Sequence, residues 1–202
     1  MAVKVVDLRC SGCRSALDPS ASFCEYCGNP VVISSFTSVL GKPVPELGKL
    51  ARALESDAQG GGDPEMENMA KFTQGSCYLR LKLYDKALPK FEAAIEDNFD
   101  NPEGYFYAAV CLLKGKKAFL TTMPSIKKAL EYLDAALMIE NRGVFNLMKA
   151  YLKYDFYARK YLQITPDYRE ELQMALANNV SQTDADTLFS ILGVEQPQTL
   201  RF

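Results

Sequence analysis

Two pairs of closely spaced cysteines near the start of the chain constrain its local fold more than any other feature. Cys10 and Cys13 form the first pair and Cys24 and Cys27 the second, with two residues inside each pair and ten between the pairs. Two intervening residues let both sulfur atoms of a pair face one point from a tight turn, so two such turns can supply four thiolates to a tetrahedral metal ion. Four thiolates on Zn²⁺ leave no position for water, and the sequence therefore predicts one structural zinc ion.

Disulfide bonds or a redox-active pair are the alternative use of such cysteines. A redox Cys-x-x-Cys motif normally begins a helix within a βαβ unit, and neither pair here has that setting. The first ten residues contain Lys4, Asp7 and Arg9 and no long apolar run, so we expect no secretory signal and a cytoplasmic protein. Because that compartment is reducing, paired cysteines there bind metal more often than they form disulfides.

The segment around these cysteines resembles a short zinc ribbon of the bacterial type. The resemblance rests on the two Cys-x-x-Cys turns, on Gly28 after the last cysteine and on Phe23 before the third, whereas Arg14 replaces the glycine common in such ribbons. It implies short β-hairpins within residues 1–34, with Phe23 and Tyr26 covering the metal. Basic and acidic side chains cancel in this segment, so we expect it not to bind nucleic acid.

A linker with one short amphipathic helix is expected over residues 35–63. Serine, glycine and proline suit a semi-extended connector at its start. Residues 46–58 then carry apolar side chains at helical spacing. We favour a helix that caps the following domain, and a partner-binding helix is the alternative. The apolar positions are Leu47, Leu50, Ala51 and Leu54.

Residues 64–202 are predicted to form a domain of helical repeats that starts with Pro64 at the first helical position. Between residues 75 and 94, small and aromatic residues follow one another at spacings of 3, 6, 3, 4 and 3. This pattern resembles a tetratricopeptide repeat, a pair of antiparallel helices of about 34 residues. A second copy follows over residues 105–136, with an insertion around residues 115–124. The chain thus resembles bacterial proteins that join a zinc ribbon to tetratricopeptide-like repeats. The positions in the first copy are Gly75, Tyr78, Tyr84, Ala87, Phe91 and Ala94.

The later helices fit the repeat only loosely. Residues 145–162 are predicted to form one long helix with an aromatic face, and another helix is expected to start with Pro166 at its first position. The last helix is predicted to start at Ser181, in a capping box with Asp184, and to end at Gly193. We interpret it as the terminal cap that helical solenoids require.

The repeat resemblance implies a partner-binding face on the first helix of each pair. This face lacks the lysine and asparagine that clamp a peptide carboxylate in chaperone-type repeats, and its apolar character favours an amphipathic helix or a hydrophobic peptide. The same side chains could instead pack against the chain's own later helices, and the sequence leaves both possibilities open. The residues concerned are Met69, Phe72, Ser76, Leu79, Phe106, Val110 and Leu113.

The chain has six cysteines and no histidine, which excludes a Ser-His-Asp triad, a Cys-His pair and histidine-ligated zinc. Cys77 and Cys111 occupy positions where small residues pack, so we expect them to be buried thiols. Carboxylate catalysis by Asp134 and Glu131, or by Asp155, is an alternative, but their spacing is that of solvated helix faces. We therefore expect a protein that is not an enzyme.

These patterns together predict a non-enzymatic adaptor for protein–protein interaction, in which structural zinc stabilises the N-terminal cysteine segment. A net charge of −2 gives no attraction to nucleic acid. The sequence contains no run of 18 apolar residues, so we expect no membrane span. The alternative is a nucleic-acid-associated regulator that reads its target with the ribbon or with the Tyr/Lys/Arg helix 149–161. In that helix, core packing of the aromatic residues is the simpler interpretation. The identity of the protein partner and the oligomeric state are not encoded in these patterns.

Overall fold

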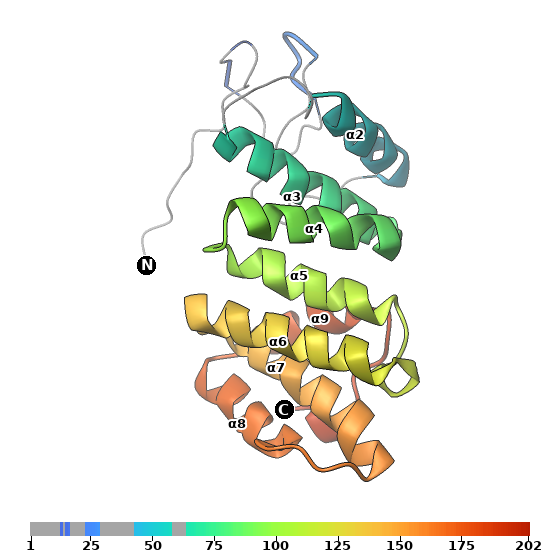
Figure 1. Cartoon of the computed structure of the whole chain (residues 1–202), viewed down its shortest axis with the longest axis vertical. Helices are drawn as coiled ribbons and strands as arrows, with labels where there is room; N and C mark the ends of the chain where they lie inside the picture. Colours follow the sequence, from blue (N-terminus) through green and yellow to red (C-terminus); the bar gives the residue numbers. More distant parts are fainter. Residues whose placement is uncertain (1–12, 14, 17–22, 29–42, 58–63) are drawn as a thin grey trace. The chain divides into compact units, whose positions relative to one another are not determined.

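A computed structural model of the chain describes residues 13, 15–16, 23–28, 43–57 and 64–202. The chain forms two compact units, Met1–Asp97 and Asn98–Phe202. Eight α-helices and no sheet lie among the described residues, so the predicted mainly helical class is confirmed (Figure 1). The β-hairpins predicted for the ribbon fall mostly outside the described residues. Within residues 13, 15–16 and 23–28, only Ala16 and Phe23 form isolated β-bridges.

The first unit contains a helical hairpin built from α3 (Pro64–Arg80) and α4 (Tyr84–Asp97). Pro64 begins α3, as predicted, because a proline at the first helical position lacks only an N–H that has no partner within the helix. Gly75 lets the two helices approach closely, since a Cβ there would lie 3.1 Å from the ring of Phe91. Phe91 and Ala87 are fully buried. The predicted helix pair is therefore present, with Gly75, Ala87 and Phe91 at its contact.

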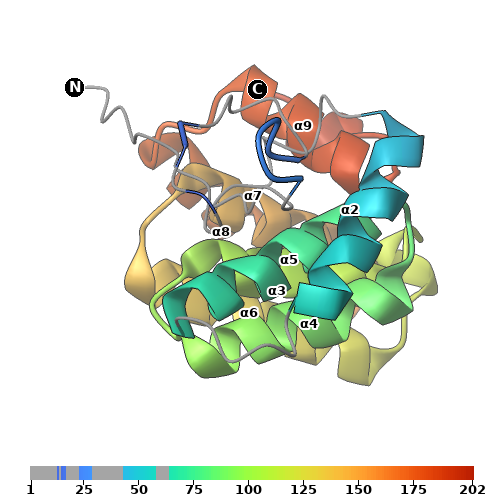
Figure 2. The same ribbon diagram turned by 90° about the horizontal axis from the view of Figure 1, so that it is seen from above.

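Helix α2 (Val44–Asp57) lies along α3 in the same unit (Figures 1 and 2). The Gln74 amide donates to the carbonyl oxygen of Ala51 over 2.9 Å, and the Tyr78 hydroxyl donates to Glu55 over 2.9 Å. The helix expected over residues 46–58 is confirmed with slightly different ends, and it covers α3 as a capping helix does. The apolar face that it buries consists of Leu47, Leu50, Ala51 and Leu54.

The second unit begins with the hairpin of α5 (Pro102–Leu113) and α6 (Met123–Ile139). The insertion between them carries the short 3₁₀ helix η1 (Ala118–Leu120). The hydroxyl of Thr122 accepts a hydrogen bond from the Ser125 N–H and caps α6. The expected second helix pair and its insertion are therefore present.

The prediction of one long α-helix over residues 145–162 is wrong in part, because the segment changes its helix type along its length. Helix α7 runs from Gly143 to Leu152 and continues directly into the π-helix η2 (Lys153–Tyr157) and the 3₁₀ helix η3 (Ala158–Lys160). Tyr161 then ends the run in the left-handed conformation, at φ +57°, with 96 % of its side chain exposed. Sequence periodicity at the α-helical spacing does not reveal such a change of hydrogen-bonding pattern.

Helix α8 runs from Tyr168 to Ala177, so the prediction that Pro166 is the first residue of a helix is wrong. Asp167 is the N-cap, because its carboxylate accepts from the N–H groups of Arg169 and Glu170. A side-chain cap with this geometry fixes the start of the helix two residues after the proline. Helix α9 (Gln182–Leu192) agrees with the prediction, with the capping box of Ser181 and Asp184 and Gly193 as its left-handed C-cap. It lies against α7 and α5.

Candidate metal centre

Three of the four predicted ligands lie together in the described part of the first unit. The Sγ atoms of Cys13, Cys24 and Cys27 are all within 4.8 Å of one another, close enough to hold one metal ion. The Sγ atoms of Cys13 and Cys24 are 3.6 Å apart. Cys10, the fourth predicted ligand, lies outside the described residues. Cys13 and Cys24, eleven positions apart in the sequence, are thus brought to one point.

The turn around Cys24 and Cys27 shows how the local sequence brings its sulfur atoms close together. The Gly28 N–H donates to the carbonyl oxygen of Cys24 over 2.9 Å, and Gly28 takes φ +75°. Glycine adopts this left-handed conformation without the steric cost that a side chain brings, which explains its place after the last cysteine. Cys24 is buried, whereas Tyr26 is 77 % exposed. The prediction that Tyr26 covers the metal is therefore wrong, and its ring points into solvent.

Ser15 is a polar neighbour of the sulfur atoms that the sequence analysis did not identify. Its hydroxyl oxygen lies 3.0 Å from Cys13 Sγ and 3.4 Å from Cys24 Sγ. The hydrogen bond from Ser15 lowers the pKa of the Cys24 thiol to about 6 and also holds the pKa of Cys13 below its ordinary value. The thiolate is the form that binds metal, so this hydroxyl favours the ligand form at neutral pH. The only sequence signal was a hydroxyl residue two positions after a candidate ligand.

The residues predicted for a partner-binding face are mostly buried. Phe72 packs edge to face on Phe91 of its own hairpin, with ring centroids 5.6 Å apart. Phe106 packs on Phe145 of α7 at 5.1 Å, which is the intramolecular alternative that the sequence left open. Met69 is half-buried. A groove on these side chains stays a prediction, and a partner would have to replace such contacts. The buried members are Phe72, Ser76, Leu79, Phe106, Val110 and Leu113.

Two lysines of the Tyr/Lys/Arg helix 149–161 form ion pairs with another side chain of the second unit. Lys149 and Lys153 both contact the Glu171 carboxylate of α8, at 2.9 Å and 2.5 Å from Oε1. Glu171 is fully buried, and Lys149 also pairs with Asp134 over 2.8 Å. Burial raises the pKa of Glu171, but hydrogen bonds from Lys153 and Lys149 outweigh it, so that pKa lies below its ordinary value. The two lysines therefore attach α8 to α7.

The carboxylates considered for catalysis have separate surroundings. Asp134 pairs with Lys149, and Glu131 is exposed on α6. Asp155 is buried, pairs with Arg159 and accepts a hydrogen bond from the backbone N–H of Phe119 over 2.7 Å. Such partners give Asp155 a role in holding the insertion against the π-helix.

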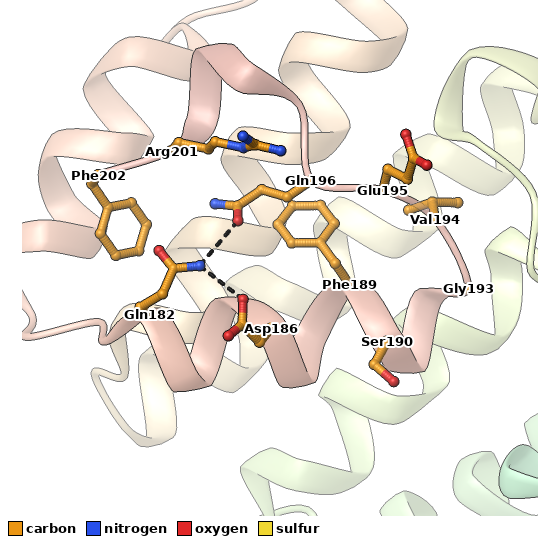
Figure 3. Close-up of a pocket in the computed structure, with 10 residues that line it drawn as sticks. All are labelled: Gln182, Asp186, Phe189, Ser190, Gly193, Val194, Glu195, Gln196, Arg201 and Phe202. Carbon is orange, nitrogen blue, oxygen red and sulfur yellow. Dashed lines mark hydrogen bonds between the residues drawn. The ribbon is translucent and has the colours of Figure 1, made fainter.

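A hollow lies where the C-terminal tail folds back over α9 (Figure 3). Gln182 of α9 donates to Gln196 of the tail over 3.3 Å and to Asp186 over 2.8 Å. Phe189 and Phe202 contribute rings to the lining, and Arg201 extends from the tail beside them. The hydrogen bonds fix the tail on the helix.

Comparisons with models of protein families, with curated proteins and with solved structures find no match for this chain. No helix in the described part of the chain has both the length and the apolar character needed to cross a membrane. The class of protein is therefore defined by the helical hairpins and the cysteine cluster alone.

Proposed function

We propose that Cys10, Cys13, Cys24 and Cys27 bind one structural zinc ion. The observation that carries this proposal is the convergence of three Sγ atoms at one point. A tetrahedron with Zn–S bonds of about 2.3 Å has sulfur atoms roughly 3.8 Å apart. The 3.6 Å between the Sγ atoms of Cys13 and Cys24 is close to that edge length. Cys10 would complete the tetrahedron, because its spacing from Cys13 equals that of Cys24 from Cys27.

Zinc in this site acts on folding and takes no part in a reaction. A segment of about 25 residues buries too little apolar surface to fold alone, so metal binding supplies its folding free energy. With four thiolates around it, the ion has no position left for a water molecule or a substrate. With zinc bound, the cysteine segment would form a small folded module that precedes the helices in the sequence.

The function supported best is that of a non-enzymatic adaptor for protein–protein interaction. The cysteine module provides one docking surface and the helical hairpins provide another. Support comes from the sequence resemblance to zinc ribbons and tetratricopeptide-like repeats, together with the paired helices α3–α4 and α5–α6. The nucleic-acid alternative has less support, since Lys149 and Lys153 are bound to Glu171.

Native mass spectrometry of the full chain, purified from its own cells, tests both parts of the proposal. We expect a mass excess of one zinc ion that a chelator removes, and a protein that co-purifies reproducibly. Cys24→Ser should lose the metal, whereas Cys77→Ser, at a buried helix position, should keep it. A metal-free protein with disulfides between these cysteines would contradict the zinc site. Zinc without a reproducible protein partner would contradict the adaptor role and leave the site intact.

A further inference from the structure

Three features of the second unit that depart from the repeat pattern meet at one hollow. They are the insertion after α5, the π-helix η2, and the C-terminal tail after Gly193. The hollow has a volume of about 460 Å³ and is distinct from the cysteine cluster, which belongs to the first unit. Lys117 comes from the insertion, Asp155 from η2 and Arg201 from the tail.

The π-helix holds the insertion in place on one side of this hollow. The backbone N–H of Ala118 donates to the Tyr151 hydroxyl over 3.1 Å, and that of Phe119 donates to Asp155 over 2.7 Å. Asp155 and Tyr151 are both buried. Segments of π-helix are rare and are found frequently at functional sites. The irregular helix here gives the wall of the hollow a fixed shape.

The tail contributes a second part of the lining and has anchoring contacts of its own. Leu200 is fully buried, and the Gln196 amide donates to its carbonyl oxygen over 2.9 Å. Gln182 of α9 holds Gln196 in turn (Figure 3). Arg201 follows the buried Leu200 directly, so its position along the rim is set by that anchor.

The charges around the hollow are uneven. Arg159 pairs with the buried Asp155 and stacks over the Phe119 ring, 4.7 Å from its centroid. Among the described residues, neither Lys117 nor Arg201 has an ion-pair partner. Glu195 is the one other acidic residue in the lining. Lys117, Arg159 and Arg201 thus outnumber Asp155 and Glu195 in the lining, which leaves one positive charge in excess.

We propose that this hollow binds a small molecule that carries a phosphate group. Its volume lies within the range of about 300–1,000 Å³ that is usual for ligand sites. A guanidinium offers two parallel donors to phosphate oxygens and an ammonium adds a point charge, and Arg201 and Lys117 supply these groups from the tail and from the insertion. Gln198 and Thr199 line the same wall as Arg201 and offer an amide and a hydroxyl as further donors.

Isothermal titration calorimetry of the full, metal-loaded chain with inorganic pyrophosphate tests the proposal. We expect saturable binding that weakens about tenfold in Lys117→Gln and in Arg201→Gln, because each removes a charge-assisted hydrogen bond. Arg169→Gln is the matched control, since Arg169 is exposed on α8 and does not line the hollow. Its affinity should equal that of the unmodified chain.

Chemical-shift mapping of the unmodified chain provides a readout that does not depend on any variant folding. Pyrophosphate should shift the amide signals of Lys117 and Thr199, which line the hollow from the insertion and from the tail. The proposal is overturned if binding is not saturable at millimolar pyrophosphate. It is equally overturned if the double variant of Lys117 and Arg201 binds as tightly as the control, or if the shifts gather on residues away from the hollow.

Discussion

Lys153 of the π-helix donates from Nζ to Oε1 of Glu171 over 2.5 Å, and both side chains are buried. The same ammonium donates to the carbonyl oxygen of Pro166 over 2.8 Å. Lys149 shares the carboxylate, so two cations surround one buried anion between α7 and α8. Removing a charge from water is costly, and such a cluster is stable only while every member keeps its partners.

Glu171→Gln should destabilise the protein by about 3 kcal/mol, because removing one partner of a buried pair leaves the other charge uncompensated. Two lysines would share that loss here. Urea denaturation of the full chain measures the free energy of unfolding. Glu131→Gln, at an exposed position of α6, is the control and should change that free energy by no more than about 0.5 kcal/mol. A cost for Glu171→Gln of less than about 1 kcal/mol would show that the cluster contributes little.

The stabilisation from this cluster should decrease both at acid pH and at strongly alkaline pH. The pKa of Glu171 lies below its ordinary value of 4.5, so its contribution is present above that pH and is lost as pH falls through the lower native value. Burial lowers the pKa of Lys149, but hydrogen bonds to Asp134 and Glu171 outweigh it and hold that pKa above 10.5. The contribution of Lys149 to stability is complete below pH 10.5 and is lost as the pH rises through its higher pKa in the folded protein. The difference in unfolding free energy between the unmodified chain and Glu171→Gln should therefore shrink from neutral pH to about pH 3. An unchanged difference at acid pH would contradict the assignment.

Local signals in the sequence predicted the parts of the fold that local chemistry determines. Pro64 lacks an N–H that would have no partner in the first turn, and the capping box of Ser181 and Asp184 satisfies such N–H groups, so the pattern alone places those helix starts. The approach of Gly75 to Phe91 also followed from spacing, because the two lie in adjacent helices of one hairpin. The convergence of the cysteines is local in the same sense.

Long-range pairing explains what the sequence analysis missed. Lys149 and Lys153 stand among aromatic residues, and nothing near them in sequence indicates that Glu171 will neutralise them. Asp167, and not Pro166, starts α8 because its carboxylate reaches two backbone N–H groups. The hollow beside the π-helix depends on three segments far apart in sequence, and no single motif indicates it.

Two glycine-to-alanine variants should have opposite effects on stability. A Cβ at Gly75 would lie 3.1 Å from the Phe91 ring, which is fully buried and cannot move away, so overpacking should cost about 1 kcal/mol after the gain in helix propensity. A Cβ at Gly48 of α2 meets nothing within 4 Å, and Gly48→Ala should stabilise by roughly 0.5–1 kcal/mol. Thermal denaturation of both variants measures the two shifts. Shifts of the same sign would refute the packing argument.

Gly143→Ala should be the most damaging of the glycine variants. A Cβ there would lie 2.6 Å from the carbonyl oxygen of Ala175 and 2.8 Å from the backbone nitrogen of Val180. Backbone atoms cannot rotate away as a side chain can, so α8 must separate from α7 at a cost of more than about 2 kcal/mol. Hydrogen exchange should then accelerate in α8 and leave α3 and α4 unchanged. Uniform acceleration along the whole chain would instead indicate global unfolding.

Thiol labelling should separate the six cysteines into two classes. Cys77 and Cys111 are 0 % and 1 % exposed within helices, so a thiol reagent reaches them only when the protein unfolds. The four candidate ligands are protected by bound metal and become reactive once a chelator removes it. Mass spectrometry of the native chain should therefore show no labelling with zinc, four labels with chelator, and six after denaturation. Labelling of Cys77 or Cys111 in the native, zinc-loaded protein would place those thiols at the surface, and full labelling without a chelator would show that the cysteine cluster holds no metal.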